Sequence, residues 1–170
     1  MDLNRTLNSI SRALSSAGID HALIGGFALA AYGVVRATVD IDLLVDGRMK
    51  SKAKAACLKS GFSIVNETGE VLQLSGAGQV DMVFANREPT QKMLVRASVK
   101  LDFPIKIVLP EDLIGLKIQA YRNDPTREYQ DKADIHALMK ANPGLDLNIV
   151  RGYADLFGEW KTIESMRKKI

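Results

Sequence analysis

The chain has 170 residues, of which 46% are hydrophobic and 25% are charged, with a formal net charge of +3. This length and composition are typical of a globular domain with one core, and no apolar run approaches the roughly 20 residues of a membrane span. The N-terminus lacks the basic-then-apolar order of a secretory signal, and Cys57 is the only cysteine. We therefore expect a cytoplasmic protein without intramolecular disulfides or a membrane segment.

The first half of the chain is predicted to alternate helices and strands. Apolar periodicity and glycine stop signals predict a helix over 2–17, a strand over 21–24, a helix over 26–32, a strand over 39–45 and a helix over 49–59. Strands are predicted over 62–66, 71–74 and 79–84. The sequence Gly76-Ala77-Gly78 predicts a turn that joins the last two strands as a hairpin.

The second half is predicted to be mainly helical. A helix over 90–97 and a strand over 105–109 precede helices over 110–122, 128–141, 147–157 and 160–169. The order predicts an α/β (α+β) fold in which a small mixed sheet is flanked by helices. We expect residues 1–109 to form the α/β core and residues 110–170 to form a helical segment packed on it as one compact unit.

Two glycines and two aspartates form the most informative pattern. Gly25 and Gly26 follow an apolar strand, where they would let the backbone approach a phosphate closely. Asp40 and Asp42 are two residues apart on the next strand, so their side chains should point to the same face. Two such carboxylates repel each other by about 4 kcal/mol at an effective dielectric near 20, which favours a bound cation, and Mg²⁺ suits oxygen ligands.

A third carboxylate can complete this site. Asp81 lies in the strand predicted over 79–84, where alternation places Val80 and Met82 on the opposite face. Three carboxylates from neighbouring strands could hold two divalent ions, one on a triphosphate and one on an acceptor hydroxyl. The glycine turn by itself is equally consistent with a plain strand-to-helix connection, and a solvated strand face is the alternative for the aspartates.

With Gly25, Gly26, Asp40, Asp42 and Asp81 in these positions, the chain resembles the DNA polymerase beta-like nucleotidyltransferase superfamily. The segment 36–45 is similar to the minimal stand-alone members, which are often toxin–antitoxin proteins. Downstream, Lys117, Arg122, Asp131 and Asp134 are similar to the basic and acidic helical motifs of abortive-infection nucleotidyltransferase toxins.

The resemblance implies a role for each matching residue. Gly25 and Gly26 would cradle the triphosphate of an NTP, Asp40 and Asp42 would bind two Mg²⁺ ions, and Asp81 would bind the ion that activates the acceptor. Lys117 and Arg122 would contact phosphates. Apart from the resemblance, Arg36 lies near the carboxylates in the sequence and would either contact a phosphate or pair with Asp40. For Asp131 and Asp134 we favour surface charge on a helix.

These observations lead to two functional hypotheses. The first is an enzyme that transfers a nucleoside monophosphate from an NTP to a hydroxyl of a tRNA, a protein or a small molecule, in a toxin–antitoxin system with a cognate partner protein. The second is a catalytically silent protein of the same fold, an antitoxin that binds a nucleotide or a partner. Position 26 is glycine where many active transferases have serine, which removes a possible hydroxyl contact to phosphate.

Overall fold

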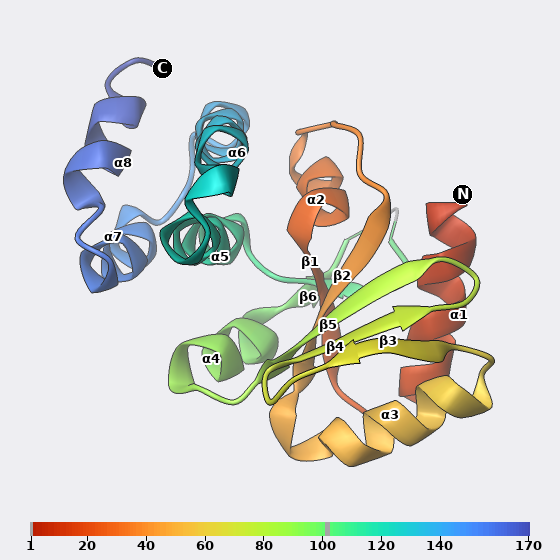
Figure 1. Cartoon of the computed structure of the whole chain (residues 1–170). Helices are drawn as coiled ribbons and strands as arrows, with labels where there is room; N and C mark the ends of the chain where they lie inside the picture. The colour runs from red at the N-terminus through yellow and green to blue at the C-terminus, as the bar shows by residue number, and fades with distance from the viewer. Residues whose placement is uncertain (1, 101–102) are drawn as a thin grey trace. The chain divides into compact units, whose positions relative to one another are not determined.

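The computed structural model describes residues 2–100 and 103–170. They divide into two compact units (Figure 1). Unit 1 comprises the described residues up to Ala31 and from Arg36 to Val108, and unit 2 comprises Tyr32–Val35 and Leu109–Ile170. The predicted boundary between residues 109 and 110, and the packing of the helical segment on the core, stay predictions.

Unit 1 is built on a mixed sheet with the strand order β3-β4-β5-β2-β1-β7-β6. Its strands are β1 (His21–Ile24), β2 (Asp40–Asp46), β3 (Ser63–Glu67), β4 (Val71–Ser75), β5 (Gln79–Ala85), β6 (Ser98–Val99) and β7 (Lys106–Ile107). The central strand β2 is parallel to β5 and antiparallel to β1. The mixed sheet and its flanking helices confirm the predicted fold class.

The helices of unit 1 are α1 (Leu3–Ser16), α2 (Gly25–Ala28), α3 (Lys50–Lys59) and α4 (Glu88–Arg96), with short 3-10 turns η1 (Leu29–Tyr32) and η2 (Gly47–Met49). Alternate residues of the central strands make one face of the sheet fully buried, including Ile41, Leu43, Val80, Met82 and Phe84. Helix α3 lies over this face, because the Lys50 ammonium is 5.3 Å from the ring centre of Phe84. The core of unit 1 therefore leaves the opposite face of the same strands partly open.

Unit 2 is helical. It contains α5 (Pro110–Asn123), the 3-10 turn η3 (Pro125–Arg127), α6 (Glu128–Ala141), α7 (Leu147–Leu156) and α8 (Trp160–Arg167). Helix α5 contacts both α6 and α7. The segment Tyr32–Val35 joins this unit through a hydrogen bond in which the Asn142 side-chain amide donates to the Tyr32 carbonyl at 3.0 Å.

The predicted elements agree with the structure except around residues 98–109. Strand β6 has only two residues, both exposed, and no local pattern indicated it. The strand expected over 105–109 is limited to β7, because Val108 and Leu109 already lead into the first turn of α5. The predicted hairpin is present as the antiparallel pair β4 and β5. Among the described residues, no helix is long and apolar enough to cross a membrane.

Candidate active site

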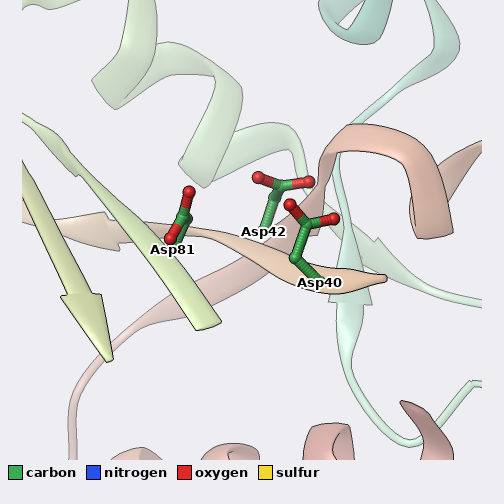
Figure 2. Close-up of side chains that lie close together, drawn as sticks. All are labelled: Asp40, Asp42 and Asp81. Atoms are coloured by element: carbon green, nitrogen blue, oxygen red, sulfur yellow. The ribbon is translucent and has the colours of Figure 1, made fainter. Parts of the chain in front are cut away.

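The pairing of β2 with β5 brings the predicted carboxylates together. The two strands are parallel, and in their register Asp42 lies directly beside Asp81. Asp40 is two residues before Asp42, so all three side chains leave the sheet on its partly open face (Figure 2). Each of the three is intermediate in burial.

The three side chains fit a divalent cation. Each contributes one carboxylate oxygen to a group whose atoms all lie within 4.8 Å of one another. Oxygens from several carboxylates, partly open to solvent, are the donor set that Mg²⁺ prefers, because this ion retains several waters and binds few protein ligands. The mutual repulsion of three negative charges also favours a cation at this position.

Two neighbouring polar side chains orient the carboxylates. The Thr38 hydroxyl donates a hydrogen bond to Asp40 Oδ1 at 2.9 Å. The Gln73 amide nitrogen lies 3.2 and 3.1 Å from the two oxygens of Asp81 and donates to this carboxylate. Sequence reasoning missed both residues. Gln73 pairs with Asp81 in the register of β4 against β5. That register is the only signal from which its contact with Asp81 could have been predicted.

Gly25 is required by the position of Asp42. Its φ of +69° is in the left-handed region, and a Cβ built there would lie 1.8 Å from Asp42 Oδ2. Only glycine gives the turn this backbone conformation without strain and leaves room for the carboxylate. The glycine therefore has a function that the sequence interpretation did not include, which is to admit Asp42 into the cluster.

Gly26 lies beneath the Arg36 side chain. A Cβ at Gly26 would lie 2.8 Å from Arg36 Nη2 and 2.9 Å from the Thr38 hydroxyl oxygen. Arg36 Nη1 donates to its neighbouring carbonyl at Ala37 at 2.8 Å. A guanidinium group therefore covers the glycine turn next to the carboxylates, so positive and negative charge are adjacent at the end of β1 and the start of β2.

The remaining predicted residues belong to unit 2. Lys117 is buried, and its ammonium lies 2.9 Å from Asp131 Oδ1 and 2.5 Å from Asp134 Oδ2. Asp131 and Asp134 are likewise buried, so their interpretation as helix surface charge was wrong. The physical reason is the buried ammonium between α5 and α6, which compensates both carboxylates. Arg122 is exposed and pairs with Glu159 at 3.2 Å.

The chain matches a known protein family over nearly its whole length. The family described as "Nucleotidyl transferase AbiEii toxin, Type IV TA system" matches residues 7–167. The chain belongs to this family. It is a nucleotidyltransferase, related to minimal members of the DNA polymerase beta-like superfamily, and the predicted resemblance to abortive-infection toxins is confirmed. No curated protein matches its sequence.

Solved structures share the fold. The solution structure of the antibiotic-resistance factor ANT(2'')-Ia has 18% sequence identity and a TM-score of 0.68, with 100% of both chains covered. Its crystal structure in complex with adenylyl-2''-tobramycin has 18% identity and a TM-score of 0.66, covering 91% of this chain and 96% of that one. The lincomycin-bound lincosamide adenylyltransferase LnuA has 16% identity and a TM-score of 0.61, covering 81% and 96%. At these identities the likeness establishes the fold.

Proposed function

We propose that this AbiEii-family protein transfers a nucleoside monophosphate from an NTP to an acceptor hydroxyl and releases pyrophosphate. The hydroxyl oxygen forms a bond to the α-phosphorus, the bond from that phosphorus to the bridging oxygen of pyrophosphate breaks, and the hydroxyl proton passes to solvent water. The observation that carries the proposal is that Asp40, Asp42 and Asp81 each place one carboxylate oxygen within 4.8 Å of the others on a partly open sheet face.

The three aspartates would hold Mg²⁺, two ions in our proposal. Asp40 and Asp42 would bind both ions, and Asp81 would bind the one nearer the acceptor. When bound, the ions neutralise the triphosphate and lower the pKa of the acceptor hydroxyl. Thr38 and Gln73 hold two of the carboxylates in place, because each donates a hydrogen bond to one of them.

The nucleotide would lie against the glycine turn. The spaces where Gly25 and Gly26 lack a side chain are taken by Asp42 and Arg36, so the turn places the guanidinium of Arg36 close to the carboxylates, where it would supply positive charge to the triphosphate. Charge-assisted contacts from guanidinium to phosphate are among the stronger hydrogen bonds. Lys117 and Arg122 stay candidates for phosphate contacts. For Lys117 such a contact requires that it share its ammonium with Asp131 and Asp134.

The family supports a role as the toxin of a toxin–antitoxin pair, with a cognate antitoxin as partner. The acceptor in our proposal is the hydroxyl of a tRNA, a protein or a small molecule. The alternative is a silent protein of the same fold that binds the nucleotide without transfer. The presence of all three carboxylates in one group favours the enzyme, because binding alone does not require the third.

The deciding experiment measures thermal stability with each of the four NTPs, with and without Mg²⁺, in the wild type and in Asp42→Asn. A ligand at a hundred times its Kd adds about 2.7 kcal/mol of stability. We expect a Mg²⁺-dependent rise in Tm that Asp42→Asn loses. Asp46→Asn is the matched control, because Asp46 is on the same strand but pairs with Arg48. A shift without Mg²⁺ dependence, or one that Asp42→Asn retains, would contradict the proposed site.

Transfer itself is tested with an α-labelled NTP incubated with cell extract. We expect incorporation of label into an acceptor fraction by the wild type and a loss of about 1000-fold or more in Asp42→Asn, because metal stabilisation of a phosphoryl transition state contributes several kcal/mol. Nucleotide binding without any incorporation would support the silent alternative.

A further inference from the structure

A basic groove runs between α1 and α3 of unit 1. Its lining includes the exposed side chains of Arg5 and Arg12 from α1 and of Lys52 and Lys59 from α3. No carboxylate is among the described residues that line it. None of these four cations has a side-chain ion pair or hydrogen bond among the described parts of the chain, whereas Lys50 and Lys54 on the same helix both pair with Glu67. The four cations are therefore available to a ligand.

The groove is separate from the carboxylate cluster. Helix α3 covers the sheet face that carries Phe84, whereas Asp81 points to the opposite face because the two residues are three apart on one strand. A ligand in the groove would therefore lie on the other side of the sheet from Asp40, Asp42 and Asp81. Its charge serves neither the metal nor the nucleotide of the proposed reaction.

The cations are arranged in two pairs along the groove. Arg5 and Arg12 are seven residues apart on one helix, as are Lys52 and Lys59 on the other. Seven residues correspond to about 10.5 Å along a helix. Seven residues are also nearly two full turns, so the two cations of each pair lie on the same face of their helix. Each helix thus offers two positive charges along the groove, and the four together suit an extended polyanion such as a phosphodiester backbone.

The other lining residues favour nucleic acid over a protein. Alanine, serine and asparagine supply most of the remaining surface, and Leu58 is the one large apolar side chain among the described lining residues. Protein interfaces depend on buried aromatic and other large anchors, which this groove lacks. Its volume of about 1180 Å³ also exceeds the roughly 300–1000 Å³ of small-molecule pockets. We propose that the groove between α1 and α3 binds the sugar–phosphate backbone of a nucleic acid without reading its bases.

The test is fluorescence anisotropy with a labelled RNA hairpin and a duplex DNA of the same sequence, at 50 and 200 mM salt. Four phosphate contacts predict that affinity for the duplex falls about 100-fold over this range. Arg12→Gln with Lys59→Gln should leave two contacts, and the fall should then be about 10-fold. The control, Lys140→Gln with Lys161→Gln, removes the same charge from exposed residues of unit 2 and should behave as the wild type. Comparing the two probes shows whether RNA or DNA is preferred.

The outcomes separate this proposal from the proposed reaction. Asp42→Asn should bind nucleic acid as the wild type does, so failure of catalysis leaves the groove testable. Unchanged binding in the groove variant, with its Tm unchanged, would overturn the proposal, as would absence of binding in the wild type. Binding of polyglutamate as tight as that of nucleic acid, lost in the same variant, would assign the groove to an acidic protein and overturn the proposal as well.

Discussion

At the scale of single residues, the glycine turn is the most sensitive part of the candidate site. Gly25 and Gly18 both have a left-handed φ, but only Gly25 faces a neighbouring side chain. We expect Gly25→Ala and Gly18→Ala each to lose about 1–2 kcal/mol of stability through backbone strain. Gly25→Ala should in addition displace Asp42 and abolish the Mg²⁺-dependent Tm shift.

Gly18→Ala is the control for this comparison, since nothing lies within 4 Å of its added Cβ. It should retain the shift. If Gly25→Ala kept the full Mg²⁺-dependent stabilisation, the close approach of Gly25 to Asp42 would have no part in metal binding.

His21 should make the folding stability depend on pH below neutrality. Burial lowers its pKa from 6.5, against the raising effect of the Ile19 carbonyl that accepts from Nδ1. The unfolded chain therefore takes up a proton at a higher pH than the folded chain. The stability contributed by the neutral imidazole is complete above pH 6.5 and is lost as the pH falls through the folded-state pKa.

Melting curves between pH 8 and pH 5 test this expectation. The Tm of the wild type should fall as the pH drops below 6.5, and His21→Gln should show a smaller fall. His136→Gln is the control, because His136 is the only other histidine. Equal falls in wild type and His21→Gln would assign the acid sensitivity to other groups.

At the scale of elements, sequence patterns predicted most of the fold and part of the site. Helix α6 has the predicted bounds, because the Asn123-Asp124-Pro125-Thr126 turn before it and the Asn142-Pro143-Gly144 break after it are both local signals. Strand β6 depends on pairing with β7, and the Gln73 contact depends on the register of β4 against β5. Pairing partners are distant in sequence, so periodicity could not indicate them. Lys117 illustrates the same limit, because its two carboxylates come from another helix.

The buried ionic cluster of α5 and α6 should dominate the stability of unit 2. Lys117→Met removes the ammonium that Asp131 and Asp134 share and leaves Asp131 only its contact with the more exposed Arg127, so we expect a loss of about 3–5 kcal/mol. Asp155→Ala, which removes the partner of an exposed pair with Arg151, should cost about 0.5 kcal/mol or less. Chemical denaturation measures both.

A triple variant separates folding from nucleotide binding at this position. Replacing Lys117 by Met and both Asp131 and Asp134 by Leu removes the three buried charges and leaves only the exposed Arg127 without its Asp131 partner, so stability should recover relative to Lys117→Met. If NTP affinity in the stable triple variant equals that of the wild type, the predicted phosphate contact of Lys117 is excluded. A selective loss of affinity would support that contact.

The packing of α5 against α7 gives a second prediction at this scale. A Cβ at Gly115 would lie 2.5 Å from the Tyr153 ring, so Gly115→Ala should cost about 1–3 kcal/mol through overpacking. Gly152→Ala, on α7 with nothing within 4 Å, should instead stabilise by about 0.5–1 kcal/mol, because alanine favours a helix. Changes of the same sign in Tm for both variants would contradict this account.

At the scale of the whole molecule, the pKa of Tyr32 depends on whether unit 2 is folded around it. Burial, together with the nearby Glu111 and Asp112 carboxylates, raises its pKa to about 12. A chain ending at Val108 lacks both carboxylates, and Tyr32 is then its only tyrosine. We expect its pKa to return toward 10, as measured by ultraviolet absorbance titration.

The difference between the titrations of the wild type and Tyr32→Phe isolates the same group in the full chain. A pKa near 12 in the shortened chain would show that residues 109–170 do not supply the environment of Tyr32.

The chain passes between the two units three times, because Tyr32–Val35 belongs to unit 2 although its neighbours on both sides belong to unit 1. This arrangement limits how the helical unit of one family member can be replaced by that of another. Consider a chimaera that joins the first 108 residues of one family member to the helices of another. Its residues 32–35 would come from the first parent, whereas the rest of unit 2 would come from the second. Tyr32 and the nearby Glu111 and Asp112 carboxylates would then come from different parents, so a helical unit is transferred intact only when residues 32–35 accompany it.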